Sequence, residues 1–307
     1  MGILNQINIL RLSCCFALIF LIVQCPSASE SEYEPQFSDN SSTGKHTYVF
    51  GIHPLHNPAR LHETFGPLAD LLSENIPEAN FRIEASRNYS AFDKKLYAGK
   101  FDFTLPNPYQ TVLALKKGYR VFGKMGDDFN FRGIIVARKD SKIRIPSDLK
   151  GHAVSFPAPT ALAATMLPQF YLQTHGLNVM KDIQIKYVGS QESSIMNVYY
   201  KTTTAGATWP PPWKALLKEK PELAKEMKVL WQTDPLPSNS LMARNDIPED
   251  LIEKVSQVIF NLHKNERGRK ILEKMELSKF EPASESTYLP VKIFIQEFST
   301  TVRPVNQ

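Results

Sequence analysis

FRGIIVARKDS (131–141), IPSDLKGHAVSF (145–156) and PAPTALAATMLPQFYL (157–172) form the most informative stretch of this chain. Its apolar runs predict one strand over 133–137 and a second over 153–156, which ends at Pro157 and Pro159. A helix is expected to begin near Thr160. The free backbone amides and the positive dipole of a helix N-terminus favour an anion, and Thr160 adds a hydroxyl. The stretch therefore predicts an anion-binding corner between a strand and a helix.

Strands and helices alternate on both sides of this stretch. Before it, strands are predicted at 47–52, 81–85 and 101–105, with helices at 57–74, from Ser90 (a capping-box pattern with Asp93) and from Asn107-Pro108. After it, strands are predicted at 184–188 and 227–232, with helices at 160–174, 191–200, 213–226, 248–263, 265–275 and 285–298. This alternation predicts an α/β fold with open, mostly parallel sheets flanked by helices.

The order of these elements predicts two lobes joined by a hinge. We assign residues 46–138 and 236–307 to lobe 1 and residues 139–235 to lobe 2, with crossings near 137–141 and 233–238. Open α/β sheets bind ligands beyond the ends of their strands. The ligand is therefore expected between the lobes.

Short motifs along the chain carry a family resemblance. They are GIHP (51–54), FGPLADLL (65–72), NYS (88–90), LYAGKFD (96–102), LPNPY (105–109) and GSQES (189–193). In this order, and with the stretch 131–172, they resemble the phosphonate/phosphite/phosphate-type periplasmic substrate-binding proteins of ABC transporters. The resemblance covers nearly the whole mature chain. It implies a two-lobe type II periplasmic-binding-protein fold that captures a small oxyanion and delivers it to an inner-membrane permease.

The first 29 residues read as a signal peptide. Arg11 precedes an apolar stretch over 16–23, and small residues at 27–29 precede Glu30. Residues 30–45 are polar and aperiodic, which predicts a flexible leader. The three cysteines (Cys14, Cys15, Cys25) all fall in the signal peptide, so the mature chain would hold no thiol. We expect a periplasmic protein; lipid anchoring at Cys25 is the alternative.

Charge and motif content exclude several classes. The formal net charge of +5 falls to +4 without residues 1–29, and basic and acidic residues are interspersed, so no nucleic-acid surface is predicted. The sequence holds no nucleophile elbow, P-loop, dinucleotide fingerprint or metalloprotease helix, so we predict neither an enzyme nor a cofactor. We expect a monomer.

Candidate ligand contacts in the first lobe are Tyr89, Tyr109 and Asn107. Both tyrosines lie at predicted strand-to-helix corners that face the cleft, and the resemblance places Tyr109 where the family has a ligand-facing tyrosine. A place in the apolar core is their alternative. Asn107 is expected to cap its helix, with ligand contact as a second role.

Candidate contacts in the second lobe begin with Thr160 and the backbone of Ala161. The family has a Ser/Thr cluster at this turn, whereas this chain offers one hydroxyl among apolar neighbours; Thr160 as a plain helix cap is the alternative. Gln191 stands where the family usually has histidine, and it can hydrogen-bond without adding charge.

The sequence TWPPPW (208–213) predicts a rigid loop that holds two indoles. We expect Trp209 to contact the ligand, with packing as a hydrophobic plug between loop and lobe as the alternative. Trp213 is a candidate for which that alternative is equally favoured. In the family this region supplies a carboxylate to an aminated ligand. This chain has none there, which disfavours an aminoalkylphosphonate.

Two further candidates are His53 and Arg132. His53 lies in the first strand-to-helix turn, near the cleft, and Arg132 either pairs with a carboxylate or faces the ligand. His53, His56 and His62 lack the spacing and the further ligand of a recognisable zinc site, so we predict no metal. The departures at 160–162, 191 and 209 leave two alternatives to the oxyanion reading: transport of a more apolar ligand such as a lipid or sterol, or ligand sensing for a membrane histidine kinase.

Overall fold

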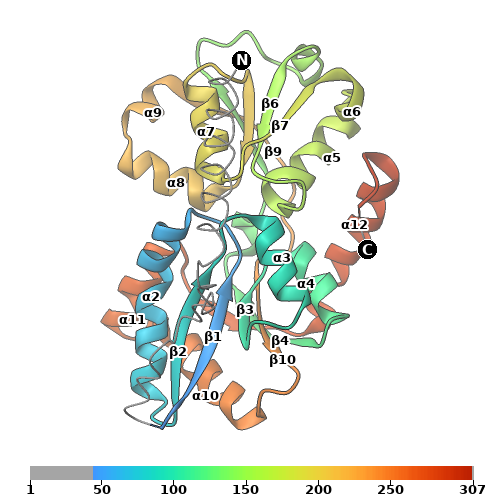
Figure 1. Cartoon of the computed structure of the whole chain (residues 1–307). Helices are drawn as coiled ribbons and strands as arrows, with labels where there is room; N and C mark the ends of the chain where they lie inside the picture. Colours follow the sequence, from blue (N-terminus) through green and yellow to red (C-terminus); the bar gives the residue numbers. More distant parts are fainter. Residues whose placement is uncertain (1–43, 306–307) are drawn as a thin grey trace, which may run out of the picture. The chain divides into compact units, whose positions relative to one another are not determined.

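The fold contains two mixed sheets, each flanked by helices on both faces (Figure 1). In this computed structural model, residues 44–305 are described; the predicted signal peptide, its cysteines and nearly all of the leader lie outside them. The first sheet has the strand order β11-β4-β10-β3-β1-β2, and the second has the order β7-β6-β8-β5-β9. The predicted two-lobe α/β architecture is thereby confirmed.

The first lobe is built on the first sheet. Its strands are β1 (His46–Ile52), β2 (Ala79–Ala85), β3 (Phe103–Leu105), β4 (Tyr119–Met125), β10 (Ser240–Arg244) and β11 (Phe280–Pro282). Its helices are α2 (Pro58–Asn75), α3 (Tyr89–Tyr97), α4 (Pro108–Leu115), α10 (Glu249–Phe260) and α11 (Glu266–Lys274). Helices α2, α10 and α11 cover one face of the sheet, while α3 and α4 cover the other (Figure 1). Strands β4, β10 and β11 of this lobe were not predicted from the sequence.

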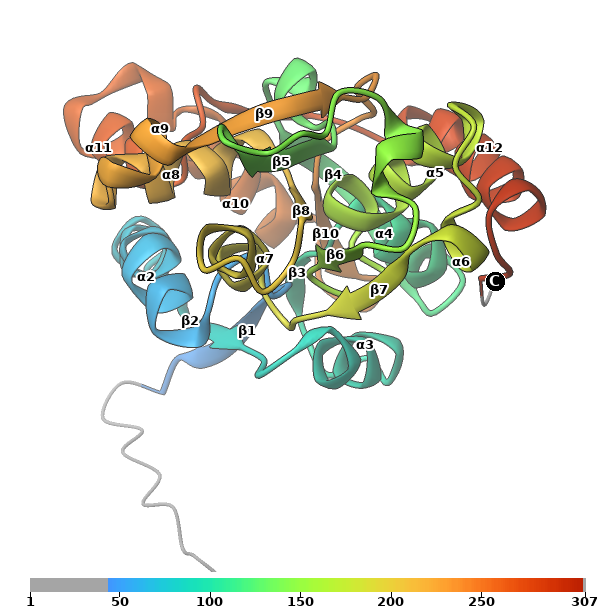
Figure 2. The same cartoon turned by 90° about the horizontal axis from the view of Figure 1, so that it is seen from above.

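The second lobe repeats this arrangement on the second sheet. Its strands are β5 (Ile134–Arg138), β6 (Ala153–Phe156), β7 (Gln184–Tyr187), β8 (Ala205–Thr208) and β9 (Met227–Gln232). Its helices are α5 (Leu167–Thr174), α6 (Val179–Asp182), α7 (Gln191–Tyr199), α8 (Pro210–Glu219) and α9 (Glu222–Glu226). Figure 2 shows α5 and α6 on one side of this sheet and α7, α8 and α9 on the other.

The two strands that follow the crossings make the sheets mixed rather than mostly parallel. β5 pairs antiparallel with β8 and β9, and β10 pairs antiparallel with β3 and β4. The crossings therefore run over 126–133 and 233–239. The sequence-based division placed residues 134–138 in lobe 1, whereas β5 belongs to the second sheet, because its apolar pattern predicts a strand but not its partners.

A last helix, α12 (Leu289–Thr301), contacts both lobes. It packs against α4 of the first lobe and α5 of the second. Its apolar face joins a buried cluster that contains Tyr109 of the first lobe and Trp209 of the second. The two lobes are thus joined by a continuous apolar core as well as by the two crossings.

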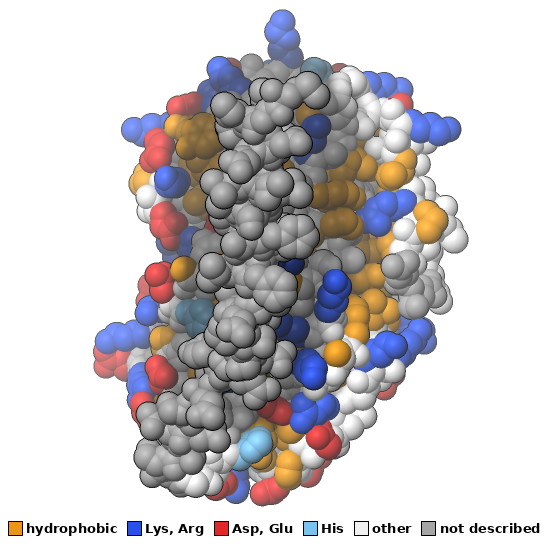
Figure 3. Space-filling model, viewed as in Figure 1, with side chains coloured by type: hydrophobic (Ala, Val, Ile, Leu, Met, Phe, Trp, Pro, Cys, Tyr) orange, Lys and Arg blue, Asp and Glu red, His pale blue; other side chains and the backbone are white. Residues whose placement is uncertain are grey.

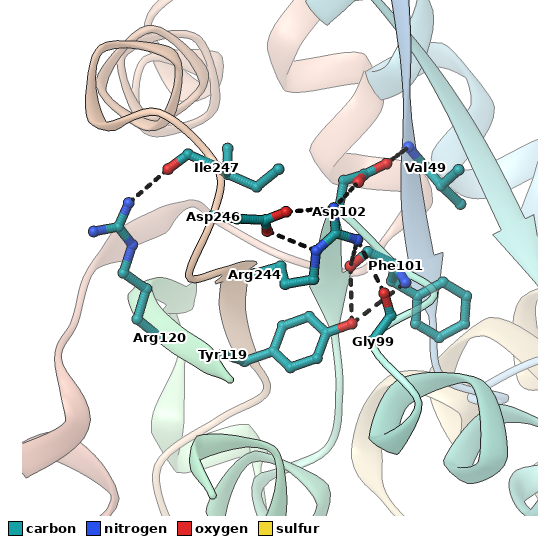
Figure 4. Close-up of polar contacts among 9 residues, drawn as sticks. All are labelled: Val49, Gly99, Phe101, Asp102, Tyr119, Arg120, Arg244, Asp246 and Ile247. Carbon is teal, nitrogen blue, oxygen red and sulfur yellow. Dashed lines mark hydrogen bonds and ion pairs between the residues drawn. The ribbon is translucent and has the colours of Figure 1, made fainter. Parts of the chain in front are cut away.

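A polar network fixes the loop that precedes β3 (Figure 4). Asp102 Oδ2 accepts from the backbone amide of Val49 at 2.7 Å, and Arg244 Nη2 lies 2.9 Å from Asp102 Oδ1. The Arg244 Nη1 group also donates to the carbonyl oxygen of Gly99 at 2.9 Å. A Cβ on Gly51 would approach the ring of Phe101 to 2.4 Å, so only glycine allows β1 to pass this loop. β3 is thereby held in register with β1 as far as Leu105.

Surface charge on the visible part of one face is of both signs (Figure 3). Lysine and arginine side chains lie among aspartate and glutamate there. Among the described residues, no helix has the length and apolar character needed to cross a membrane.

Candidate functional site

A small cavity, which we name the interlobe cavity, lies where the two lobes meet. The residues that line it come from both lobes and from both crossings: His53, Tyr89, Asn107, Phe131, Ala161, Leu162, Ala163, Ala164, Gln191, Trp209 and Asn239. The centre of a water-sized sphere can occupy about 10 Å³ of it. That is about the space needed for one water molecule. The structure thus has the lobes in contact over this site.

One wall of the cavity is a helix start. After β6, the chain turns through 157–160 and enters a π-helical turn, Leu162–Met166, that continues as α5. The amides of Thr165 and Met166 both donate to the carbonyl of Ala161, at 2.8 and 3.2 Å. Amides in the first turn of a helix have no acceptor within it, and π-turns are frequent at functional sites. The predicted helix N-terminus is therefore present, and its residues 161–164 line the cavity.

A chain of polar groups orients the Tyr89 phenol across the lobe boundary. Thr208 Oγ1 donates to Gln191 Oε1 at 3.4 Å, and Gln191 Nε2 donates to the Tyr89 hydroxyl at 3.4 Å. Burial raises the pKa of Tyr89 above its usual value, so the phenol keeps its proton. Because the Tyr89 oxygen already accepts from Gln191, its O–H is left as a donor.

The local sequence places both of these residues at helix starts. Tyr89 begins α3, which is capped by Asn88 and not by Ser90 as predicted, because the Asn88 side chain accepts from the amide of Ala91 at 2.9 Å. Gln191 begins α7, which is capped by Ser190.

His53 supplies a neutral imidazole to the cavity. Its Nδ1 lies 2.8 Å from the carbonyl oxygen of Leu105, and since a carbonyl only accepts, Nδ1 carries the proton. Burial, opposed in part by this hydrogen bond, lowers the pKa of His53 to about 4. Nε2 therefore holds a lone pair, and it makes no hydrogen bond within the described part of the chain.

Two asparagines complete the polar lining. Asn107 caps α4 as predicted, in a capping box with Gln110, and its Nδ2 donates to the carbonyl of Thr160 at 3.0 Å. It therefore ties the lobes together at the helix start. Asn239, just before β10, is fully buried; Nδ2 lies 3.3 Å from Met125 Sδ, and Oδ1 has no partner among the described residues. Sequence reasoning missed Asn239, because a single polar residue in a return segment carries no motif.

Trp209 forms the apolar side of the cavity. Its indole is 4% exposed and packs edge-on against Phe131, with ring centroids 5.5 Å apart. The three prolines after it begin α8 rather than a rigid loop, because the first turn of a helix needs no amide donors there. This corrects the loop predicted over 208–213.

Four of the sequence candidates lie outside the cavity lining. Trp213 is on α8 and packs with the core of the second lobe. Tyr109 is buried in the cluster shared by both lobes, and burial raises its pKa. Thr160 contributes its carbonyl to Asn107, and Arg132 lies in the first crossing with its buried Nε lacking a partner among the described residues. The structure thus brings His53, Tyr89, Asn107, Ala161, Gln191 and Trp209 together and leaves these four apart.

Ion pairs beside the cavity also bridge the lobes. Glu192 of α7 lies 3.4 Å from His56 Nδ1 and 3.5 Å from Arg60 Nη1. Arg60 Nη2 lies 2.7 Å from Glu219, and Lys218 pairs with Glu276 at 2.6 Å. Within residues 44–305, no group of three or more His, Cys, Asp or Glu side chains has the arrangement of a metal site.

The lining itself is electrically neutral. Among the described residues that form it, none is Lys, Arg, Asp or Glu, and its histidine is uncharged at neutral pH. What the cavity offers is a set of backbone amides and a phenol as donors, and an imidazole nitrogen and an amide oxygen as acceptors. This set suits a small, polar ligand.

Comparison with known proteins shows a family to which most of the chain is similar. Residues 50–288 match the family described as "ABC transporter, phosphonate, periplasmic substrate-binding protein". A curated relative, the "Phosphonates-binding periplasmic protein" of Escherichia coli (strain K12), is 21% identical over 163 residues, which cover 52% of this chain and 48% of that protein. The chain thus spans about half the length of the curated relative that it matches.

Two solved structures share the fold. The binding-protein component of an ABC phosphonate transporter from Pseudomonas aeruginosa has a TM-score of 0.77 at 18% identity, covering 84% of this chain and 88% of that one. A protein from Prochlorococcus marinus (MIT 9301), solved in complex with methylphosphonate, has a TM-score of 0.75 at 19% identity, covering 82% and 98%.

Proposed function

Because the chain belongs to the family of ABC-transporter phosphonate periplasmic substrate-binding proteins, we propose that it captures a small phosphorus oxyanion, of the phosphonate or phosphate class, between its lobes. The single observation that carries this proposal is the interlobe cavity, which residues of both lobes line around a helix start. A ligand held there contacts both lobes at once. Binding is then coupled to the relative position of the lobes.

The donors of the cavity support an anionic ligand. The backbone amides at the start of the Leu162–Met166 turn lie at the N-terminal, positive end of a helix, where they favour an anion. The Tyr89 hydroxyl adds a neutral hydrogen-bond donor. A buried anion needs several hydrogen bonds to replace its hydration shell. Asn107 is already bonded to Thr160, so the amides and Tyr89 are the groups we assign to the anion.

Ligand entry requires the lobes to separate. The residues that line the interlobe cavity are buried, and its space admits about one water molecule. Separation at the crossings 126–133 and 233–239 would break the contact between Asn107 and Thr160 and the pairs of Glu192 and Glu219 with the first lobe. Hinge opening of this kind is the common motion of two-lobe binding proteins.

In this proposal the protein works in the periplasm and hands its ligand to a membrane permease. A lipid or sterol ligand finds less support at this site, because the indole of Trp209 and the ring of Phe131 are packed against each other and the cavity beside them admits about one water molecule. A sensor role would use the same site.

The proposal is tested by calorimetric titration of the purified protein with methylphosphonate, phosphite, phosphate and sulfate. We expect saturable 1:1 binding of at least one phosphorus oxyanion. Tyr89→Phe should weaken that binding by about tenfold or more, because a hydrogen bond to a charged group contributes about 1.5–3 kcal/mol.

Tyr97→Phe is the matched control for this variant. Tyr97 lies on the same helix, and its buried hydroxyl has no partner among the described residues and does not line the cavity. Its affinity should equal that of the unmodified protein. Absence of binding by all three phosphorus oxyanions would refute the proposal.

A further inference from the structure

The interlobe cavity contains acceptors as well as donors, which is unusual for a site that binds an anion. His53 lines the cavity and is 3% exposed, and its Nδ1–H is committed to the carbonyl of Leu105 at 2.8 Å. Its other nitrogen, Nε2, can only accept. Asn239 also lines the cavity, fully buried, and its Oδ1 has no partner within residues 44–305.

A hydrogen-bond acceptor of the protein and an anionic oxygen of the ligand repel each other unless a proton lies between them. A buried acceptor left without a donor also loses the hydrogen bonds that it made to water. A fully ionised oxyanion has only acceptors. It would leave both His53 Nε2 and Asn239 Oδ1 unsatisfied, with lone pairs facing lone pairs.

The neutral lining of the cavity also disfavours a fully ionised oxyanion. No Lys or Arg is among the described residues that line the cavity. Arg132 follows Phe131 in the crossing without lining the cavity, and Arg303 lies behind the turn, with Nη2 2.6 Å from the carbonyl of Pro159. Transfer of a doubly charged ion into a neutral, buried site costs much more than transfer of a singly charged one, because the desolvation cost rises steeply with charge.

We propose that the interlobe cavity binds its phosphorus oxyanion as the singly protonated monoanion, whose P–OH group donates a hydrogen bond to His53 Nε2. This inference rests on the proposed function and adds a substrate class to it: acids that keep one O–H group near neutral pH. Asn239 Oδ1 is a second acceptor for an acid with two O–H groups, such as dihydrogen phosphate. An alkylsulfonate has the same shape and charge as an alkylphosphonate monoanion but no proton to donate, so the site rejects it.

The groups around His53 define how the test must be controlled. His56 lies three residues along the same segment, Tyr89 faces it from α3, and Glu192 lies beside the cavity on α7. Burial lowers the pKa of His56, and burial, opposed by His56, Arg60 and Asn57, leaves the pKa of Glu192 below its usual value. At neutral pH and above, these shifts favour one form of each group, a neutral His56 and an ionised Glu192.

Asp93 is the exception. It lies one helical turn from Tyr89, accepts from Gln110 Nε2 at 2.7 Å, and burial raises its pKa to about 6. Its ionisation adds a negative charge on α3 within the range of the experiment. The Asp93→Asn variant removes this charge. In the comparison of the two ligands the effect of Asp93 cancels, because in the proposal the phosphonate binds as a monoanion, with the same charge as the sulfonate.

The experiment is a calorimetric titration of the full mature chain with methylphosphonate and with methanesulfonate at half-unit steps from pH 5.5 to 8.5. We expect methylphosphonate affinity to fall about tenfold per pH unit above the second ionisation of the ligand, in the unmodified protein and in Asp93→Asn alike. Methanesulfonate should bind at least about 100-fold more weakly than methylphosphonate at pH 5.5, since a site built around a ligand hydroxyl rejects an analogue that lacks it.

Two variants assign the acceptor. His53→Phe keeps an aromatic ring and removes Nε2, so the preference for phosphonate over sulfonate should shrink to less than about tenfold. His62→Phe, at an exposed position of α2, should leave the preference unchanged. Asn239→Leu should leave the preference for methylphosphonate over methanesulfonate unchanged and should weaken phosphate binding. If His53→Phe does not fold, the pH dependence and the methanesulfonate comparison in the unmodified protein still test the inference.

The outcomes separate this inference from the function on which it rests. Two results would overturn the protonated-ligand inference while leaving oxyanion capture in place. One is a methylphosphonate affinity that stays constant or increases at pH values above the second ionisation of the ligand. The other is methanesulfonate binding as strong as that of methylphosphonate. An unchanged preference in folded His53→Phe would overturn the role of His53. No binding of any phosphorus oxyanion at any pH would overturn the function and the inference together.

Discussion

His56 Nδ1 of the first lobe and Glu192 Oε1 of the second lobe lie 3.4 Å apart across the lobe boundary. The two atoms are within ion-pair distance but are not aligned as a hydrogen bond, and each lacks another hydrogen-bond partner in the described part of the chain. Arg60 Nη1, at 3.5 Å, supplies the positive charge that this carboxylate needs. The lobe contact therefore depends on Glu192 staying ionised.

The first prediction is that Glu192→Gln opens the ligand-free protein. The neutral amide keeps the shape of the side chain but loses the charge interaction with Arg60, which we expect to remove about 1–2 kcal/mol from the lobe contact. That change shifts the ratio of contacting to separated lobes about 5- to 30-fold. Small-angle X-ray scattering should then report a larger radius of gyration. Glu266→Gln, which breaks an exposed pair within α11, should leave the radius unchanged. Equal radii for all three proteins would contradict this prediction.

The second prediction concerns the loss of stability in acid. Burial lowers the pKa of His53 from 6.5 to about 4, so below pH 6.5 the unfolded chain binds a proton that the folded chain does not. Stability therefore falls as the pH decreases from 6.5 towards 4, by about 3 kcal/mol from this residue at 1.36 kcal/mol per pKa unit. Urea unfolding at several pH values measures the slope.

His53→Gln should flatten most of this slope, because glutamine does not titrate. Part of the slope should persist, since burial also lowers the pKa of His56. His62→Gln, at an exposed site on α2, is the control and should retain the full slope. A slope in His53→Gln equal to that of the unmodified protein would show that other groups control acid unfolding.

The sequence predicted the elements more reliably than their partners. Asn107-Pro108 and the strand over 153–156 were found because capping and strand breaking by proline are local effects. The strand over 134–138 was found too, but its membership in the second sheet depends on pairing with β8 and β9, which lie far along the chain. No local pattern contains that information.

The candidate site divides in the same way. Tyr89 was proposed because it lies at a predicted strand-to-helix corner, which faces the cleft in an open α/β fold, and Gln191 because it stands where the family usually has histidine. Both residues begin helices in the structure. Trp213 and Asn239 could not be placed from the sequence. The direction of Trp213 depends on the start of α8 at three prolines, and Asn239 enters the cavity only because the second crossing returns beside Met125.

The third prediction is that Trp209→Ala destabilises the protein. Trp209 is 4% exposed and belongs to the apolar cluster shared by the lobes, so truncation should cost about 3–5 kcal/mol. A double-mutant cycle with Phe131→Leu should yield a coupling of about 0.5–1.5 kcal/mol, as expected for edge-to-face rings 5.5 Å apart. Urea unfolding measures both. A cost below about 1 kcal/mol would mean that the indole is not part of the core.

The fourth prediction is that Arg303 positions the helix start that lines the cavity. Its Nη2 donates to the carbonyl of Pro159 at 2.6 Å, its Nε donates to Gln169 at 3.2 Å, and its guanidinium lies 5.0 Å from the centre of the Phe298 ring. Lysine cannot make both hydrogen bonds and the stacking contact at once. Arg303→Lys should therefore increase hydrogen exchange at the amides of residues 161–164 and weaken methylphosphonate binding about 3- to 10-fold, although Arg303 does not line the cavity. Arg269→Lys, an exposed substitution on α11, should change neither quantity. Weaker binding without faster exchange would contradict this prediction. It would indicate that Arg303 affects the ligand through its charge and not through its hydrogen bond to the 157–160 turn.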